Sequence, residues 1–149
     1  MTLQWIHKMF DDLAPGELYA ILQLRNEVFA VEQNCVYQDM DNKDQAAVHL
    51  MGWLGNTLVA YTRLIPPGKA YPEPSIGRVV SSPKVRRTGI GRELMTRSIR
   101  LLREHHGVQP VRIGAQLYLR SFYASFGFRE TGEIYLEDGI KHIEMVLLP

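Results

Sequence analysis

The chain has 149 residues, of which 46% are apolar and 22% charged, with one cysteine and a formal net charge of +1. This balance is typical of a globular protein and excludes a disordered or collagen-like chain. One cysteine cannot form an internal disulfide, no Cys/His set has zinc-site spacing, and no apolar run reaches the roughly 18 residues of a membrane span. The first residues also lack the apolar core of a secretory signal, so we expect one domain over residues 1–149, no bound metal and a cytoplasmic location.

The hydrophobic pattern predicts strands alternating with helices. The first half contains a strand over 4–10, a helix over 15–29, an irregular segment over 30–45, two strands over 47–54 and 57–65 around Gly55-Asn56, and a strand over 75–81. The second half contains a helix over 90–105, a strand over 111–115, a helix over 118–126, and a hairpin of strands over 133–136 and 142–148 around Asp138-Gly139. This order predicts an α/β fold with a mixed sheet and helices on its faces.

Charge is distributed unevenly along the chain. Residues 1–75 hold five basic and nine acidic residues, a net charge of −4, whereas residues 76–149 hold twelve and seven, a net charge of +5. Eight basic residues and one acidic residue lie between Arg78 and Arg103. This segment indicates a polyanion site, and it is equally consistent with a solvated helix face. The acidic first half disfavours a long nucleic-acid groove and favours a cationic substrate. Its trio Asp39, Asp41 and Asp44 lacks the glycine and terminal glutamate of a calcium loop.

The run from Val79 to Arg92 joins a predicted strand to a predicted helix and carries glycines at 89 and 91. Glycine lets a ligand approach the backbone closely, and the first N–H groups of a helix have no partner within it. Together with the helix dipole, these groups favour a bound phosphate or pyrophosphate. The nucleotide P-loop pattern is absent, and the dinucleotide pattern Gly-x-Gly-x-x-Gly fails because residue 94 is leucine.

This run resembles the acyl-coenzyme A motif of the GCN5-related N-acetyltransferase (GNAT) superfamily, Gln/Arg-x-x-Gly-x-Gly/Ala, with Arg86, Gly89 and Gly91 at its defining positions. The resemblance implies a mixed, mostly antiparallel sheet of about seven strands with helices on both faces. It also implies a loop whose amides bind the coenzyme A pyrophosphate, after a splayed strand whose backbone binds the pantetheine arm and the thioester carbonyl. The cofactor-binding residues implied are Val79, Val80, Ser81, Arg86, Arg87, Thr88, Gly89, Ile90, Gly91 and Arg92.

A second segment resembles the same superfamily. Gln116 stands where asparagine is usual, and Tyr123 and Gly127-Phe128 follow at the family offsets. The resemblance adds Gln116 to the cofactor-binding residues and makes Tyr123 the acid that protonates the departing sulfur. Helical spacing alone makes Tyr123 a core aromatic beside Phe122. Residues 28–37 and 137–145 further resemble the ElaA-like branch, although Lys141 replaces a proline there.

The implied function is acetyl-CoA-dependent transfer of an acetyl group to a primary amine by direct attack on the thioester. Acetyl-CoA is then a cosubstrate, and the acceptor is a small amine or a protein or peptide amine. A backbone N–H around Val80 is expected to stabilise the oxyanion. The candidates for the base are Glu27, Glu32, His49, Glu73, His142 and Glu144. Glu32 and His142 are preferred because they lie in the two ElaA-like segments, and a chain of waters is the alternative.

Two other functions stay open from the sequence. A non-catalytic acyl-CoA sensor would have the same cradle without a working base. A nucleic-acid binder would use the basic stripe from Arg78 to Arg103, but no aromatic residues are interleaved there, so we expect no nucleic-acid partner and no membrane partner. The identity of the acceptor and the oligomeric state, with a homodimer as one option, are not determined by the sequence.

Overall fold

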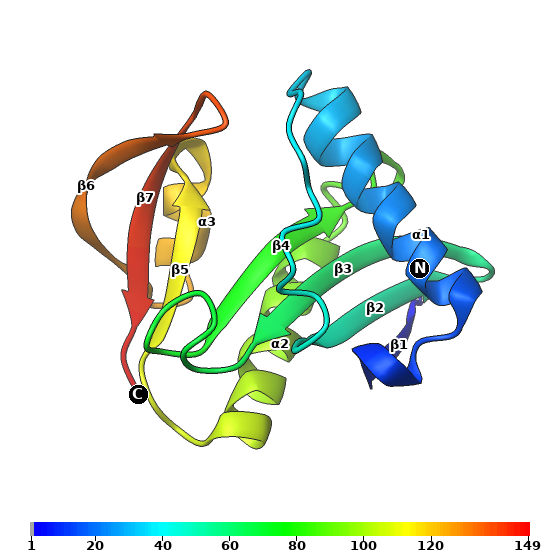
Figure 1. The fold of residues 1–149 in the computed structure, drawn as a ribbon, viewed down its shortest axis with the longest axis horizontal. Coiled ribbons are helices and arrows are strands. Elements are labelled where there is room, and N and C mark those ends of the chain that lie inside the picture. Colours follow the sequence, from blue (N-terminus) through cyan, green and yellow to red (C-terminus); the bar gives the residue numbers. More distant parts are fainter. Residues whose placement is uncertain (1) are drawn as a thin grey trace.

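The seven strands of the described part of the chain form two antiparallel sheets rather than one continuous sheet. The first sheet has the order β1-β2-β3-β4 and the second the order β5-β7-β6. The computed structural model describes residues 2–149, with these elements (Figure 1): β1 (Gln4–Met9), α1 (Pro15–Arg25), β2 (Val48–Leu54), β3 (Thr57–Ile65), β4 (Ser75–Ser81), α2 (Ile90–His106), β5 (Val111–Gln116), α3 (Arg120–Ala124), β6 (Arg129–Glu137) and β7 (Ile140–Leu147). The expected α/β fold with about seven mostly antiparallel strands is confirmed.

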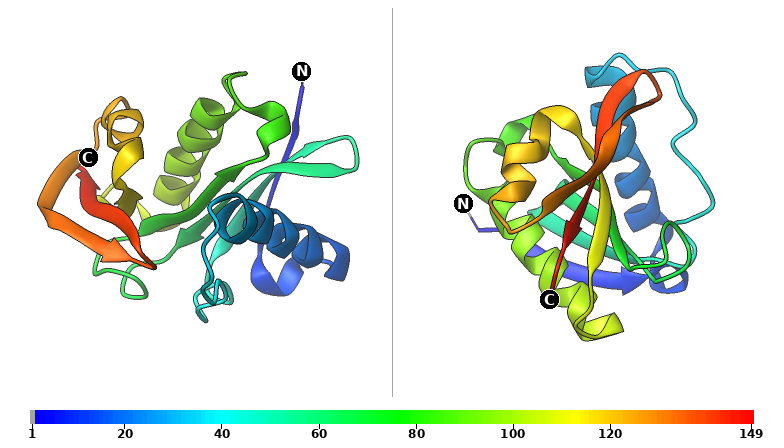
Figure 2. Two further views of the ribbon diagram at one scale, coloured as in Figure 1. Left: turned by 90° about the horizontal axis from the view of Figure 1, so that it is seen from above. Right: turned by 90° about the vertical axis from the view of Figure 1, so that its left-hand side faces the viewer.

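Strands β4 and β5 meet at one end and then diverge, as Figure 1 shows. The amide of Arg112, in β5, donates to the carbonyl of Pro74, just before β4, at 3.1 Å. Beyond this contact the two strands belong to different sheets. Helix α1 covers one face of the first sheet and α2 the other, while α3 packs beside β5 (Figure 2). The divergence leaves an edge of β4 facing the second sheet.

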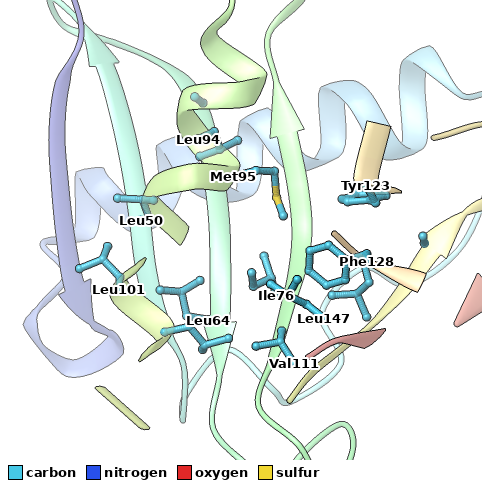
Figure 3. Packing of buried hydrophobic residues seen from close by; sticks show 14 of the residues in the cluster. Leu50, Leu64, Ile76, Leu94, Met95, Leu101, Val111, Tyr123, Phe128 and Leu147 are labelled. Atoms are coloured by element: carbon cyan, nitrogen blue, oxygen red, sulfur yellow. The ribbon is translucent and has the colours of Figure 1, made fainter. Parts of the chain in front are cut away.

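Two hydrophobic clusters hold the layers together, one on each face of the first sheet. The larger cluster lies between that sheet and α2, and it continues into the second sheet through Val111 and Phe128 (Figure 3). The smaller one lies under α1 around Ile21 and Met51. Strand β3 is buried along nearly its whole length because both of its faces are covered. Burying one leucine-sized side chain stabilises the fold by about 1.5–3 kcal/mol, so these clusters dominate its stability.

Several element boundaries differ from the sequence-based expectation. The helix expected over 15–29 becomes α1 followed by a π-helical turn at Asn26–Glu32. The helix expected over 118–126 becomes a 3-10 turn at Leu117–Leu119 followed by the short α3. Strand β6 begins at Arg129 rather than at 133, because a register shift around the left-handed Gly132 interrupts its alternation. Wide and tight helical turns depart from the 3.6-residue period, so periodicity alone does not detect them.

Three arginines and three aspartates fix the segment between α1 and β2. The residues are Arg25, Arg63, Arg78, Asp39, Asp41 and Asp44. Arg25 is fully buried and binds Asp44 at 2.8 Å, and the largely buried Arg63 binds the same carboxylate at 3.0 Å. A buried charge is tolerated only when it is paired. The aspartate trio is therefore bound by arginines, and no group of three metal-ligating side chains within residues 2–149 is placed to hold a metal ion. Within the same range, no helix is long and apolar enough to span a membrane.

His49 packs against this cluster, inside the first sheet. Its Nε2 donates to the carbonyl of Asp44 at 2.8 Å, and its Nδ1 accepts from the Tyr61 hydroxyl at 2.6 Å. Burial lowers the pKa of His49, so the neutral ring is the native form. Burial alone would raise the pKa of Asp44, but its bonds to Arg25 and Arg63 outweigh that effect and hold the pKa below 3.8. Arg63 and Arg78 act in the same way on Asp41.

These shifts predict the pH dependence of stability. Each of the three groups binds protons less tightly in the native state than in the unfolded chain, so each stabilises the fold above its unfolded pKa. We expect the free energy of unfolding to decline first as the pH falls below 6.5, the ordinary value for His49, and more steeply below 3.8, the ordinary value for Asp41 and Asp44. Urea titrations across this range measure the effect, and a flat profile would contradict it.

Asp44→Asn tests the cluster directly. The change leaves Arg25 and Arg63 with an uncompensated buried charge, which we expect to lower the free energy of unfolding by about 3–5 kcal/mol at neutral pH. Asp12→Asn is the matched control, because Asp12 is exposed, and its effect should stay within about 0.5 kcal/mol. Equal stability of the two variants would show that the cluster contributes nothing.

Candidate functional site

A cleft of about 1080 Å³ opens where β4 and β5 diverge. One wall is formed by the π-helical turn, the segment that follows it, β3 and β4, and the other by β5, α3 and the β6–β7 turn. Most of the sequence-predicted site residues line it, namely Glu32, Val79, Val80, Ser81, Arg86, Arg87, Gly91, Gln116, Tyr123 and His142. Thr88, Gly89, Ile90 and Arg92 belong to the same loop and helix start but are not among the lining residues.

Strand β4 carries a bulge where it borders the cleft. Gly77 pairs with Arg63 and Val80 pairs with Tyr61, so Arg78 and Val79 together oppose the single residue Thr62. Arg78 has a φ of 50°, in the left-handed region. A bulge of this kind bends the strand and turns its backbone groups out of the regular ladder. The backbone to which the GNAT resemblance assigns the thioester is therefore irregular at Val79.

The loop after β4 is folded tightly onto the start of α2. Ser82 accepts a hydrogen bond from the amide of Lys84 at 3.2 Å, and the Thr88 hydroxyl donates to the carbonyl of Val85, which is buried. Two left-handed residues, Arg87 (φ 63°) and Gly89 (φ 85°), then turn the chain into the helix. This geometry is inexpensive for glycine and costs other residues about 1–2 kcal/mol.

The N-terminus of α2 presents free amides beside the cleft. The first helical hydrogen bond runs from the amide of Glu93 to the carbonyl of Gly89 at 3.1 Å, so the amides of the three residues between them have no partner within the helix. A Cβ at Gly91 would meet only Phe122, at 3.9 Å, so the position is open toward the cleft. Free amides at the start of a seventeen-residue helix are suited to a phosphate or pyrophosphate.

The arginines around this helix start have different environments. Arg86 is bound by Glu32 through two hydrogen bonds of 2.5 and 2.6 Å, and it also donates to the carbonyl of Ser81. Arg92 binds Ser125 at 2.8 Å and lies over the ring of Phe126. By contrast, Lys84 and Arg87 are exposed and form no ion pair within residues 2–149. The exposed pair thus supplies mobile positive charge, whereas Arg86 and Arg92 are held by the protein.

The residues after the π-helical turn bridge the two walls of the cleft. Gln33 and Gln116 exchange two amide hydrogen bonds, of 3.1 and 3.3 Å. Cys35 donates to the carbonyl of Asp138, in the β6–β7 turn, at 3.2 Å. Together with Glu32, these residues form a strap that joins the two walls of the cleft. The only sequence signal for the strap is the likeness of residues 28–37 to the ElaA-like branch, because contacts over such separations leave no local pattern.

Tyr123 is both a core aromatic and a cleft residue. Its ring packs edge-on against Phe122, with the centroids 5.3 Å apart, and lies next to Phe128 (Figure 3). It is only 5% exposed, yet it lines the cleft. Burial raises the pKa of Tyr123, so its hydroxyl is protonated at neutral pH.

His142 lies in β7, directly opposite Gln116 of β5. Its Nδ1 is 2.7 Å from the carbonyl of Ile140, so Nδ1 carries a proton and donates a hydrogen bond to this carbonyl. This leaves Nε2 as the proton-accepting atom, 3.4 Å from Glu137 Oε2. The ring is mostly buried and stacks on Tyr135. Hydrogen bonding thus fixes the orientation of the ring and its tautomer.

The other candidates for the base lie away from the cleft lining. Glu73 and Glu144 are both bound by Arg112, at 3.0 and 3.1 Å. His49 is buried in the first sheet, and Glu27 is exposed on the π-helical turn. Of the six residues considered from the sequence, Glu32 and His142 are the ones that line the cleft. The hydrogen bond from Arg86 holds the pKa of Glu32 below its usual value.

Comparison with known proteins identifies the family. Residues 16–149 match the family model described as an acetyltransferase (GNAT) domain. The chain belongs to the GNAT family of acetyltransferases. It is 41% identical to the protein ElaA of Escherichia coli over 145 residues, which are 96% of this chain and 95% of ElaA. It is 42% identical to a UPF0039 protein of Synechocystis over 148 residues, which are 98% and 96% of the two chains.

Solved structures show the same relationship. The crystal structure of an acyl-CoA N-acyltransferase from Pseudomonas aeruginosa is 43% identical, with a TM-score of 0.93 over 98% of this chain and 99% of that one. The crystal structure of Escherichia coli ElaA is 40% identical, with a TM-score of 0.92 over the same shares. The expected resemblance to the ElaA-like branch is confirmed. Family membership supports an acyltransferase that uses acyl-CoA, and the free amides at Gly91 fit the pyrophosphate of that group.

Gly89→Ala tests whether the start of α2 binds coenzyme A. A Cβ at φ 85° is strained, which we expect to lower the free energy of unfolding by about 1–2 kcal/mol and to displace the amides that follow. Binding of coenzyme A, measured by calorimetry, should weaken roughly tenfold, as expected for the loss of a hydrogen bond to a charged group.

Gly107→Ala is the matched control for this change. Gly107 ends the same helix with a similar φ of 82° but lies away from the cleft. Its substitution should reduce stability and leave coenzyme A binding unchanged. If both variants bind coenzyme A like the unaltered protein, the helix start is not the cradle.

Proposed function

We propose that this protein is a single-domain N-acetyltransferase that transfers the acetyl group of acetyl-CoA to a primary amine by direct attack on the thioester. The supporting observation is that three independent features border one cleft: the free amides of α2, the bulge of β4, and the pair Tyr123 and His142. Each meets a different requirement of the reaction, namely an anion site, a polar backbone edge and groups that handle protons.

Acetyl-CoA supplies the activated thioester, and the residues of this chain hold it. The amides from Gly89 to Arg92, with the side chains of Lys84 and Arg87, would bind the diphosphate. The cleft edge of β4 over Val79, Val80 and Ser81 would bind the pantetheine arm, with a backbone N–H near Val80 toward the carbonyl oxygen. Gln116 would join them once its amide exchanges its partner Gln33 for the ligand.

His142 is the better of the two candidates for the base. An alkylammonium has a pKa of about 10.4, so the acceptor must lose a proton before or during attack. The bond from Nδ1 to Ile140 leaves Nε2 to take that proton, and Glu137 Oε2 lies 3.4 Å from Nε2. Glu32 is less suitable because its carboxylate is already bound by Arg86, which lowers its pKa.

Tyr123 serves the leaving group in this mechanism. As the amine nitrogen bonds to the carbonyl carbon, the carbon–sulfur bond breaks and its electron pair stays on sulfur. The Tyr123 hydroxyl, kept protonated by burial, gives its proton to the departing sulfur, so coenzyme A leaves as the thiol. The ammonium loses two protons on becoming an amide nitrogen. His142 takes the proton lost before attack and releases it to water, and the proton lost after attack passes through water to the Tyr123 phenolate.

The proposal is tested by incubating the purified chain with acetyl-CoA and a panel of amines and peptides. We expect acceptor-dependent release of coenzyme A and a product heavier by one acetyl group, detected by mass spectrometry. Binding of acetyl-CoA without turnover on any acceptor would favour the acyl-CoA sensor instead. Absence of binding would overturn both functions.

His142→Gln should reduce kcat by roughly a hundredfold at neutral pH, the usual order for removal of a general base. The loss of kcat should become smaller as the pH approaches the pKa of the acceptor amine, because the acceptor then binds already deprotonated. Glu32→Gln, on the other wall of the same cleft, is the control and should retain most of kcat. Measurement of kcat for both variants at several pH values tests this prediction. A larger loss of kcat in Glu32→Gln than in His142→Gln would assign the base to Glu32.

Tyr123→Phe should lower kcat roughly tenfold or more and leave the affinity for acetyl-CoA nearly unchanged, because only the bond to the departing sulfur is lost. Tyr118→Phe is the matched control, since Tyr118 also lines the cleft but is 72% exposed. The comparison requires a slow acceptor, for which chemistry limits turnover. Equal kcat for the two variants would exclude Tyr123 from the reaction.

A further inference from the structure

The two walls of the acceptor side of the cleft carry opposite charge. On the first-sheet wall, Lys43, Arg63 and Arg78 line the cleft together with Asp41. With Arg25, Asp39 and Asp44 behind them, this group holds four cations and three carboxylates, an excess of one positive charge. On the wall formed by the β6–β7 turn, the charged lining residues are Glu137 and Asp138. An acceptor with a single charge would be complementary to one wall only. A molecule with a positive and a negative end would be complementary to both.

Arg63 carries a hydrogen-bond donor that the protein does not use. Its Nη1 and Nη2 atoms bind Asp41 at 2.7 and 2.6 Å, and Nη1 also binds Asp44 at 3.0 Å. Its Nε is buried and has no hydrogen-bond partner within residues 2–149. Leaving a buried donor of a charged group unpaired is costly, so this N–H calls for an acceptor atom. Arg63 is only 3% exposed and lines the cleft.

The space beside this donor is kept open by a glycine. Gly77 of β4 pairs with Arg63 across the ladder, so any side chain at 77 would share the face of Arg63. A Cβ at Gly77 would stand 3.4 Å from Arg63 Nε and 3.7 Å from Ile65, and all three residues line the cleft. The absence of that Cβ leaves a niche next to an unpaired guanidinium N–H, with Lys43 and Arg78 on the same wall.

We propose that this niche binds a carboxylate of the acceptor, and that the acceptor is therefore a small amine that also bears a carboxylate, as amino acids do. The inference rests on the proposed acetyl transfer and specifies its substrate class. The carboxylate would accept from Arg63 Nε, while the ammonium end approaches Glu137 and His142 before it loses its proton. The carboxylate takes no part in the bond changes and serves recognition only.

The geometry also bears on the length of the acceptor. Gly77 and Val80 are three residues apart in β4, which corresponds to at most roughly 10 Å at the usual rise of a strand. The amine must reach the carbonyl assigned to the backbone near Val80 while the carboxylate lies over Gly77. An amino acid with several carbons between its two ends spans this distance better than glycine does.

The test compares amino acids with their own carboxamides, which differ only in the charge of one end. Glycine, γ-aminobutyrate and ε-aminocaproate are each paired with the amide, and kcat/KM is measured with saturating acetyl-CoA. We expect the acid of the longer pairs to be preferred over its amide roughly tenfold, the contribution of one hydrogen bond to a charged group, and ε-aminocaproate to exceed glycine. Equal use of acids and amides, or preference for the amides, would overturn the inference.

Two variants locate the effect in the niche. Gly77→Ala fits the fold, because its Cβ makes contacts of ordinary length, yet it fills the niche. It should reduce the preference for the acid severalfold without altering acetyl-CoA affinity. Lys43→Gln removes a partly exposed cation of this wall that pairs with Asp41 at 3.7 Å, and it should act in the same direction. Gly16→Ala, on the exposed start of α1 with no atom near its Cβ, is the control and should retain the preference. A preference unchanged in both Gly77→Ala and Lys43→Gln would overturn the assignment to this niche.

Failure of the inference and failure of the proposed function give different results. If the protein acetylates acids and amides equally well, the proposed acetyl transfer is supported and the proposed carboxylate niche is overturned. If no acceptor is acetylated, binding of the N-acetylated acid and amide in the presence of coenzyme A is compared by calorimetry. A preference for the acid that Gly77→Ala abolishes then supports the niche while the catalytic proposal fails. If the N-acetylated acid and amide bind equally well, both the carboxylate niche and the proposed acetyl transfer are overturned.

Discussion

The structure depends on a strand that pairs along one edge only. Strand β4 is hydrogen-bonded to β3 on both sides of its bulge, whereas toward β5 the backbone bond runs from the amide of Arg112 to the carbonyl of Pro74, just before β4. Backbone groups along an unpaired edge that borders a cleft need partners from water or from a ligand. The bulge at Arg78 adds to this by turning the backbone out of register. The divergence thus creates both the cleft and the polar edge that we assign to the cosubstrate.

Charge in this protein is organised by pairing across long sequence distances. Asp39, Asp41 and Asp44 are bound by arginines from α1, β3 and β4, so they anchor a segment of chain and do not form a free acidic surface. The basic stripe is also partly engaged: Arg97 binds Glu93 and lies over Trp5, and Arg103 donates to the carbonyl of Leu148. Net charge along the sequence therefore describes the cleft poorly. A buried polar atom without a hydrogen-bond partner, such as Arg63 Nε, says more about possible ligands.

The sequence pattern predicted those helices and strands whose formation depends on residues close together in the sequence. The apolar runs of β2 and β3 around Gly55-Asn56, the amphipathic face of α2 and its ending at Gly107 all follow from neighbours in sequence. The loop from Arg86 to Gly91 was likewise recognisable from its resemblance to the GNAT motif, and its left-handed Gly89 needs the conformational freedom of glycine. The π-helical turn at Asn26–Glu32 was missed, since a widened turn has no sequence period of its own. The pairs Glu32–Arg86 and Gln33–Gln116 were missed because each joins residues more than fifty positions apart.

By itself the sequence determined the order of the elements, the family and the position of the loop that we assign to the pyrophosphate, because hydrophobic period, glycine geometry and motif spacing act over a few residues. The tertiary structure decided which candidates border the cleft, namely Glu32 and His142 but not Glu27, His49, Glu73 or Glu144. It also decided which charges are neutralised, which donor is left without a partner, and that one sheet becomes two. Electrostatic pairing and burial depend on distances in space, and those distances are set only when β4 separates from β5.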